Sequence, residues 1–251
     1  MRLNRLFFGL ALLITLVSCR KDEDLNPVPG DAKVKRILLY FSLDSDKPAA
    51  IVKEFEYDGN WNVTRTSAPM YQDGEIVGNI SYDLYTYNTS GQLIKKENYN
   101  ANVNSPTGFI NLINYSYTYS EGGKLIKEVI EYPAIGQSKR ITYEYDHNLL
   151  TYVRNYNEKN QLESFILYQY DKYDRLITEK SYASIGKLIS ATDHTYQGQL
   201  LIRSDIFYGD THVREIKRTY DNNNNLMILE SRELLDYSSA LSYYHKYEYF
   251  N

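Results

Sequence analysis

Tyrosine returns along this chain at regular intervals, and this recurrence limits the possible fold more than any other feature of the sequence. The chain holds 27 tyrosines in 251 residues, and Tyr-Asp occurs at Tyr57-Asp58, Tyr145-Asp146, Tyr170-Asp171 and Tyr220-Asp221. Tyr87-Asn88, Tyr119-Ser120 and Tyr196-Gln197 fill the gaps, so successive copies lie 30, 32, 26, 25, 26 and 24 residues apart. A period in this range predicts an array of structural repeats. We call these seven tyrosines the repeat tyrosines.

Each repeat tyrosine is followed by turn-forming residues and then by apolar residues. Examples are Ser90-Gly91-Gln92-Leu93-Ile94 and Asn224-Asn225-Leu226-Met227. Gly, Asn and Asp supply the positive φ angles that tight hairpin turns need, while Tyr, Ile, Val and Thr fit a pleated strand. Each repeat therefore predicts a strand, a tight turn and a second strand, and about 25 residues is the length of one hairpin with its connection.

Alternation of side chains assigns two faces to the predicted strands. Ile141, Tyr143 and Tyr145 share one face, whereas Thr142 and Glu144 share the other. The strand Leu93-Ile94-Lys95-Lys96-Glu97-Asn98-Tyr99 carries charged side chains along its middle, which is too polar for a sandwich core. We expect an all-β fold, in which an array of antiparallel β-hairpin repeats forms a single-layer or shallowly curved, superhelical sheet. The alternative is a wrap that closes with its tyrosine face turned inward.

The repeat resembles that of YD-repeat proteins of the RHS type, in which Tyr-Asp precedes a glycine, an arginine and a leucine at a hairpin turn. Tyr170-Asp171-Lys172-Tyr173-Asp174-Arg175-Leu176 carries this likeness, which extends in degenerate form over residues 55 to 250. The resemblance implies a β-hairpin array. Such an array must protect its open edges, so Val34 to Ser42, which reads as a strand without the motif, is predicted to be its N-terminal cap.

The first residues predict export from the cytoplasm. Arg2 and Arg5 precede an apolar run from Leu6 to Val17, which is typical of a signal peptide and is too short to span a bilayer as a helix. Leu16-Val17-Ser18-Cys19 resembles the bacterial lipobox, which implies cleavage before Cys19 and lipidation of this cysteine, the only one in the chain. We therefore predict a lipoprotein signal peptide over residues 1–18, a lipidated, flexible tether over residues 19–32, and one repeat domain over residues 33–251.

Charged residues restrict the expected location of the protein in the cell and its expected binding partners. Arg20-Lys21-Asp22-Glu23-Asp24 resembles the export signal of Bacteroidota-type surface lipoproteins, which implies an outer-membrane lipoprotein exposed on the cell surface. Removing residues 1–18 removes two arginines and no acidic residue, so the formal net charge changes from −4 to −6. This acidity argues against a nucleic-acid partner. We expect the membrane, through the N-terminal lipid, as one partner, with a glycan or a protein as another.

The sequence shows no arrangement that is typical of catalysis or of a metal site. His147, His194, His212 and His245 lie 47, 18 and 33 residues apart, which favours exposed turn or strand positions over zinc ligands. The recurring aspartates are interpreted as acceptors for the amides of their own turns, in preference to a ladder of calcium ligands. There is no glycine-flanked serine and no glycine-rich phosphate loop. We therefore predict a protein that is not an enzyme and that has no cofactor and no bound metal.

The remaining functional feature is the aromatic content. Tyrosine is both a good strand former and a good contact residue, so a tyrosine-lined face is a candidate binding surface for glycan or protein. That candidate surface comprises Tyr143, Tyr145, Tyr168, Tyr170, Tyr247, Tyr249 and Trp61. One alternative is that these rings only stabilise the sheet and that the array is a spacer or scaffold in the envelope. Another is an envelope hydrolase with a carboxylate pair that the sequence does not single out.

Overall fold

The computed structural model describes residues 32–42, 44–45, 48–72, 75–234 and 242–249. The expected signal peptide, Cys19 and residues 20–31 of the expected tether lie outside these residues. The described chain forms strands only, of 7 to 13 residues each. They are β1 (Val34–Tyr40), β2 (Ala50–Tyr57), β3 (Val63–Gln72), β4 (Glu75–Tyr87), β5 (Leu93–Ala101), β6 (Phe109–Tyr119), β7 (Leu125–Tyr132), β8 (Gln137–Asp146), β9 (Leu149–Tyr156), β10 (Leu162–Tyr170), β11 (Leu176–Ala183), β12 (Leu188–Gln197), β13 (Leu200–Tyr208), β14 (Thr211–Tyr220), β15 (Leu226–Glu233) and β16 (Ser242–Tyr249).

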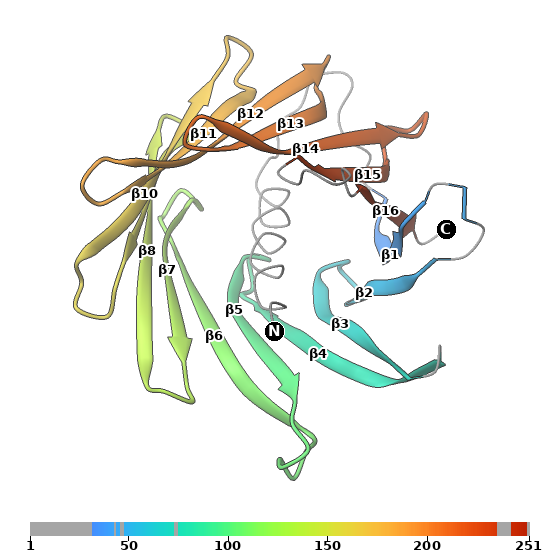
Figure 1. The fold of residues 1–251 in the computed structure, drawn as a ribbon. Helices are drawn as coiled ribbons and strands as arrows, with labels where there is room; N and C mark the ends of the chain where they lie inside the picture. The colour runs from blue at the N-terminus through green and yellow to red at the C-terminus, as the bar shows by residue number, and fades with distance from the viewer. Residues whose placement is uncertain (1–31, 43, 46–47, 73–74, 235–241, 250–251) are drawn as a thin grey trace.

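These strands close into one antiparallel barrel (Figure 1). Each strand pairs with its neighbours in the sequence, and β1 completes the circle by pairing with both β2 and β16. Ile37 lies opposite Lys53 of β2 on one side and opposite Tyr247 of β16 on the other. The prediction of an open single-layer or superhelical sheet is therefore wrong, although the all-β, antiparallel hairpin content is confirmed. Val34–Tyr40 is not a cap on an open edge, because both of its edges are paired.

A β-bulge in each repeat hairpin explains why the sheet curls. At β6–β7, Thr118 lies opposite Lys127 but Tyr119 lies opposite Leu125, so Ile126 is an extra residue on the second strand. The same one-residue shift accompanies all seven repeat tyrosines. A bulge bends its strand and increases the local twist. Seven bulges in register add these bends together, and closure then removes the exposed sheet edges.

The turns after the repeat tyrosines follow from local chemistry. In five of them the first residue donates its amide to the carbonyl of the fifth, and the fourth donates its amide to the carbonyl of the first. The fourth residue has a positive φ in each case: Trp61, Gly91, Gly123, Asp174 and Asn224. Glycine, asparagine and aspartate tolerate this conformation better than other residues do. The turn signals in the sequence therefore place the hairpins correctly.

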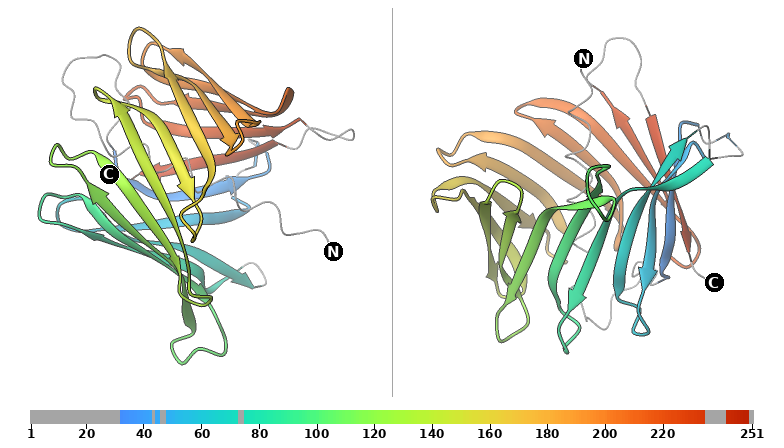
Figure 2. Two further views of the ribbon diagram at one scale, coloured as in Figure 1. Left: turned by 90° about the vertical axis from the view of Figure 1, so that its left-hand side faces the viewer. Right: turned by 90° about the horizontal axis from the view of Figure 1, so that it is seen from below.

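The antiparallel order sorts the connections between the two ends of the barrel. The turns after the repeat tyrosines lie at one end, which we call the repeat end, together with the start of β1 and the end of β16. The connections between repeats lie at the opposite end, as the side views in Figure 2 show. Within the described residues, no helix is long and apolar enough to cross a membrane.

Candidate functional site

A ring of side chains on the inner face of the barrel contains one residue from every strand. The residue two positions before each repeat tyrosine lies directly opposite a residue of the next strand, and Tyr247 lies in the same way opposite Ile37. We call these sixteen positions the inner belt. Its pairs are Phe55–Thr66, Tyr85–Lys96, Tyr117–Glu128, Tyr143–Val153, Tyr168–Glu179, His194–Ser204, Arg218–Leu229 and Tyr247–Ile37.

Exposure shows that the belt faces inward. Thr66 and Ser204 are 2% exposed, Val153 is 6% exposed, and Tyr168 and Ile37 are 9% exposed. Side chains alternate along a strand, so the residue between each belt position and its repeat tyrosine should face outward. That residue is exposed in all seven repeats, at Glu56, Thr86, Thr118, Glu144, Gln169, Thr195 and Thr219. The concave side of the barrel therefore carries the belt.

Aromatic residues occupy six of the eight even-strand positions of the belt. The Tyr143 hydroxyl donates to Glu128 Oε2 at 2.6 Å, and the Tyr85 hydroxyl lies 3.4 Å from Asp83 Oδ2 and 3.3 Å from Thr66 Oγ1. Three other hydroxyls, those of Tyr117, Tyr168 and Tyr247, make no hydrogen bond to the described part of the chain. They are the belt tyrosines whose hydroxyls are not already used within the barrel wall.

Burial keeps the belt tyrosines in their neutral form. It raises the pKa of Tyr85, Tyr117, Tyr143 and Tyr168 far above the ordinary value of 10.0, and the negative charge of nearby carboxylates adds to this effect. At physiological pH these phenols are therefore hydrogen-bond donors attached to flat apolar rings. Such groups suit the recognition of a ligand that presents both hydroxyls and apolar faces.

One arc of the inner face contains charged groups. The Lys96 ammonium lies 4.1 Å from the centre of the Tyr115 ring, and Asn98 Nδ2 donates to Asp83 Oδ1 at 2.7 Å. Burial raises the pKa of Glu128, although the hydrogen bond from Tyr143 and the charge of Lys96 oppose this change. Burial likewise lowers the pKa of Lys53, while Asp83 opposes that change. These charges are incompletely compensated, which is a common property of binding sites.

Four polar side chains from adjacent strands β11 to β14 form a hydrogen-bonded chain, which we call the polar quartet: Glu179, His194, Ser204 and Arg218. His194 Nε2 lies 3.0 Å from Glu179 Oε1, and His194 Nδ1 lies 2.9 Å from Ser204 Oγ. Arg218 Nη1 donates to Ser204 Oγ at 2.9 Å. A guanidinium only donates, so we assign the serine proton to His194 Nδ1 and the histidine proton to Nε2, facing Glu179.

The structure divides the sequence-predicted surface into three groups. Tyr143, Tyr168 and Tyr247 belong to the inner belt. Tyr145, Tyr170 and Tyr249 lie two residues further along, and their hydroxyls donate to backbone carbonyls of the neighbouring strand. Trp61 is 53% exposed in the turn between β2 and β3, and its ring lies 5.8 Å from that of Tyr57. Cys19 lies outside the described residues.

Sequence reasoning missed the polar quartet. His147 is exposed, as expected, but the prediction of an exposed position is wrong for His194, whose side chain is only 5% exposed. A signal was present nevertheless. The residue two positions before a repeat tyrosine is aromatic at Phe55, Tyr85, Tyr117, Tyr143 and Tyr168, but it is histidine in His194-Thr195-Tyr196 and arginine in Arg218-Thr219-Tyr220. These two departures from the repeat are adjacent in the barrel.

Three of the four recurring aspartates, Asp58, Asp171 and Asp221, accept amides of their own turns, as predicted, whereas Asp146 Oδ1 lies 2.9 Å from His147 Nδ1. Asp58 Oδ1 accepts the amides of Asn60 and Asn62 at 2.8 and 2.9 Å, and Asp221 Oδ1 accepts those of Asn223 and Asn225 at 2.8 Å each. Hydrogen bonds to the charged form lower the pKa of both carboxyls. Over the part of the chain that the structure describes, no three His, Cys, Asp or Glu side chains are grouped as metal ligands.

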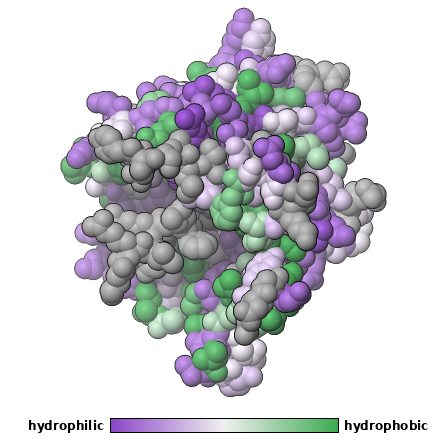
Figure 3. Space-filling model, turned by 45° about the vertical axis from the view of Figure 1, so that its right-hand side comes forward, coloured by the Kyte–Doolittle hydropathy of each residue, from purple (hydrophilic) through white to green (hydrophobic). Residues whose placement is uncertain are grey.

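The outer face of the barrel carries charges on many strands. Lys95 pairs with Glu97 at 2.9 Å, Arg154 pairs with Glu144, and Arg203 lies between Asp205 and Glu215 at 2.8 and 2.9 Å. Hydrophilic and hydrophobic residues are interspersed over the face shown in Figure 3. Charged pairs thus lie on the outward side of β5, β8, β9, β13 and β14.

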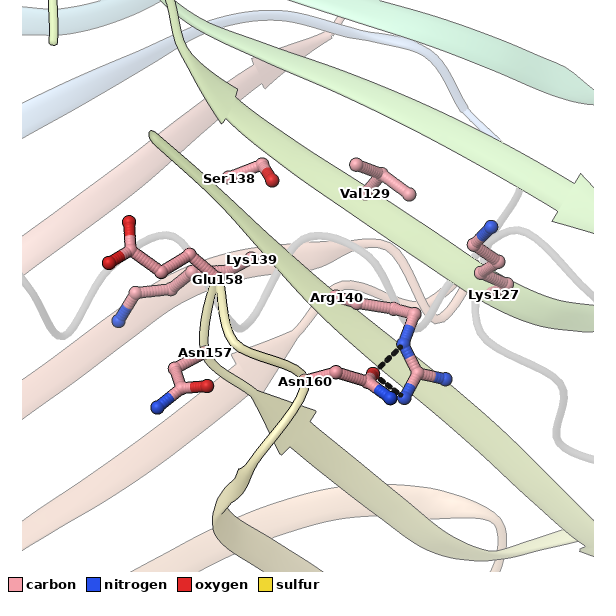
Figure 4. A pocket seen from close by; sticks show the side chains of 8 residues that line it. All are labelled: Lys127, Val129, Ser138, Lys139, Arg140, Asn157, Glu158 and Asn160. Carbon is pink, nitrogen blue, oxygen red and sulfur yellow. Dashed lines mark hydrogen bonds between the residues drawn. The ribbon is translucent and has the colours of Figure 1, made fainter. Parts of the chain in front are cut away.

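A groove on this outer face is a weaker candidate site (Figure 4). It has a volume of about 230 Å³ and is lined by Lys127, Val129, Ser138, Lys139, Arg140, Asn157, Glu158 and Asn160. The Arg140 guanidinium donates to Asn160 Oδ1 and lies 4.0 Å from the centre of the Tyr156 ring. The Arg140 guanidinium thus already has partners within the protein. The volume of the groove is below the roughly 300–1,000 Å³ of ordinary ligand pockets.

Comparison with known proteins returns distant structural similarity only. No protein-family model matches the chain, and no curated protein matches it in sequence. A porin-like protein from Bacteroides uniformis aligns over 86% of this chain and 98% of its own, with 12% identity and a TM-score of 0.45. A porin-like protein from Bacteroides vulgatus aligns over 88% and 99%, with 11% identity and a TM-score of 0.40. The complex TcdB2-TccC3 aligns over 82% of this chain and 13% of its own, with 14% identity and a TM-score of 0.35.

These alignments are too distant to transfer any property of those proteins to this chain. The class of the protein is therefore defined by its own strand pairing, as a closed antiparallel β-barrel built from tyrosine-containing hairpin repeats. The resemblance to YD-repeat proteins stays a prediction.

Proposed function

We propose that this protein is a non-catalytic binding protein of the bacterial cell envelope, held on the outer membrane and exposed at the cell surface by a lipid on Cys19. Its ligand is a glycan that contacts the inner belt. The observation that carries this proposal is the belt itself, where six aromatic positions and several partly compensated charges face the concave side of a closed barrel.

The chemistry of the belt favours a glycan. Sugar rings present apolar faces that pack on aromatic rings, and their hydroxyls need hydrogen-bond partners at the edges of those rings. Tyr117, Tyr168 and Tyr247 offer neutral hydroxyls beside such rings. A protein partner is the alternative, but a belt on the concave side of a barrel suits a small or extended ligand better than a second folded surface.

The proposed location at the membrane surface is supported by the N-terminal sequence and by the charged outer face. Cys19 follows a signal-peptide pattern, and two or more acyl chains suffice for stable anchoring. Charged pairs such as Lys95–Glu97 keep the outer face of the barrel in water. Both features support a barrel that is tethered to a membrane and does not span it.

One observation favours a second candidate function, an envelope hydrolase. Glu179, His194 and Ser204 are hydrogen-bonded in the order of an acid, a base and a nucleophile. However, Ser204 is only 2% exposed, and its oxygen also accepts a hydrogen bond from Arg218. A nucleophile must present that oxygen to the substrate, so we rank this function second. Covalent labelling of Ser204 by a fluorophosphonate would reverse the ranking.

The test of the proposed function uses the unoccupied hydroxyls of the belt. The full chain is screened against a panel of neutral and acidic oligosaccharides, and binding is measured by titration calorimetry. Tyr117→Phe and Tyr168→Phe should weaken binding about tenfold each, the usual effect of losing one hydrogen bond, without changing the melting temperature. Tyr152→Phe, on the outer face, is the matched control. Binding that is unaffected by both belt variants, or absent for every glycan, would contradict the proposal.

A further inference from the structure

The polar quartet leaves one hydrogen-bonding group unused. Arg218 Nη1 donates to Ser204, but Arg218 Nη2 is buried and has no hydrogen-bond partner within the described part of the chain. A buried donor without an acceptor is costly to maintain, and a charged donor is the most costly. The Arg218 guanidinium therefore presents an unpaired N–H edge, which is a feature that a ligand with a negatively charged oxygen would satisfy.

The hydrogen bonds around Arg218 hold its guanidinium in place. Ser204 accepts from Nη1, His194 accepts from Ser204 in the tautomer assigned above, and Glu179 accepts from His194. Three strands thus fix one side of a planar group whose other side is unused. A guanidinium that is positioned in advance binds a planar anion with little loss of side-chain entropy.

An open cavity lies beside this arginine. It has a volume of about 520 Å³ at the repeat end of the barrel, and it is lined by Gln197, Gly198, Leu200, Ile202, Arg218, Thr219, Tyr220 and Asp221. Gln197 and Thr219 are exposed on the outer face, so this cavity reaches the barrel wall from the outside next to Arg218. The phenol groups of Tyr196, Tyr220 and Tyr247 lie close enough to Arg218 to interact with it electrostatically. Burial raises the pKa of these three tyrosines, which keeps them neutral.

We propose that Arg218 is the anion-binding residue of this barrel. Its ligand is the carboxylate of a uronate residue in an acidic glycan. This inference rests on the proposed glycan-binding function and names the substrate class. The guanidinium edge matches a carboxylate in shape and charge. A single arginine with Glu179 in the same quartet suits a monoanion, whereas a phosphate dianion would require further cations.

The test compares three probes on the full chain by titration calorimetry: a digalacturonate, the matched neutral digalactose, and acetate as a free carboxylate. We expect the digalacturonate to bind more tightly than digalactose by tenfold or more. Acetate should bind weakly and should compete with the digalacturonate. If acetate alone binds as tightly as the digalacturonate, the ligand is a simple organic acid and the assignment to a glycan is overturned.

Two arginine variants test the residue. Arg218→Met should reduce digalacturonate affinity about ten- to hundredfold and abolish the preference over digalactose. Arg203→Met is the matched control, because it removes the same charge from the outer face, and it should leave affinity unchanged. Arg218→Lys keeps the charge without the planar fork and should give an intermediate loss, which provides a second readout if Arg218→Met does not fold.

The outcomes separate this inference from the function on which it rests. If digalactose and the digalacturonate bind equally, or if Arg218→Met and Arg218→Lys both bind as the native chain does, the carboxylate site is wrong and glycan binding stands. If neither sugar nor any glycan of the wider panel binds, both proposals fail.

Discussion

The hydroxyl of Tyr145 donates a hydrogen bond to the backbone carbonyl of Leu125 at 3.0 Å, and this contact joins two successive repeats. Leu125 immediately precedes Ile126, the extra residue of the bulge in the preceding hairpin. A bulge interrupts the ladder of backbone hydrogen bonds, so a side chain that supplies a donor there stabilises the fold. The same contact recurs in Tyr57–Val34, Tyr87–Val63, Tyr119–Leu93, Tyr170–Leu150, Tyr220–Leu201 and Tyr249–Leu226.

Replacing Tyr145 by phenylalanine should therefore destabilise the barrel. Tyr145→Phe keeps the ring but leaves the Leu125 carbonyl without this donor, and we expect the free energy of unfolding to fall by about 1 kcal/mol. Urea unfolding followed by circular dichroism measures the change. Tyr173→Phe, at a turn residue that is 51% exposed, is the control and should change stability by less than about 0.5 kcal/mol. If Tyr145→Phe lowers the free energy of unfolding by no more than Tyr173→Phe does, this stabilising role of the Tyr145 hydroxyl is contradicted.

Glu128 should make the barrel less stable as the pH rises. Burial raises its pKa above the ordinary 4.5, so the folded chain binds this proton more tightly than the unfolded chain does. Stability is therefore lost as the pH increases from about 4.5 through the folded pKa. Glu128→Gln stays neutral and can still accept the hydrogen bond from Tyr143. The free energy of unfolding is measured in urea from pH 4 to 7. The difference between Glu128→Gln and the wild type should shift in favour of the variant as the pH rises, and parallel pH profiles would refute this account.

Asp221 should have the opposite pH dependence. Its hydrogen bonds with the side chain and amide of Asn225 lower its pKa below the ordinary 3.8. The contribution of Asp221 to stability is therefore complete above pH 3.8 and is lost as the pH falls through the folded pKa. Asp221→Asn keeps the acceptor oxygen, as Asn88 does in the equivalent turn. Acid unfolding of Asp221→Asn should show a shallower loss of stability than that of the wild type, and Asp221→Ala should be less stable at every pH.

The sequence predicts the hairpins of this fold but not their closure. Turn residues such as Gly123 and Asn224, with the tyrosine and leucine on either side, encode each hairpin locally. Closure depends on many small bends added around the whole sheet, and on the pairing of β1 with β16, whose residues are about 210 positions apart along the chain. No local pattern shows whether those bends sum to a full circle. The charged residues in the middle of strands such as Leu93 to Tyr99 suit an open layer, but they equally suit the outer face of a barrel in water.

The candidate site was predicted only in part, for a similar reason. Alternation correctly places Tyr143 and Tyr168 on a shared face, but it does not show that this face is concave. His194 and Arg218 are isolated polar residues in the sequence, because Glu179 and Ser204, which lie beside them across the sheet, are not adjacent to them along the chain. Register brings these four side chains together, and register becomes visible only when the repeats are aligned on their tyrosines.

The last prediction concerns how the protein is held at the membrane. If the anchor is the lipid on Cys19, replacing residues 1–19 by an ordinary cleavable signal peptide should release the chain into the soluble fraction after cell lysis. The charged pairs Lys95–Glu97 and Arg203–Glu215 on the outer wall should keep the released barrel soluble without detergent. Ser18→Ala leaves the cysteine in place and is the control, which should stay with the membranes. Fractionation and immunoblotting give the result. A released form that still sediments with membranes and requires detergent would mean that protein segments, and not the acyl chains, contact the lipid.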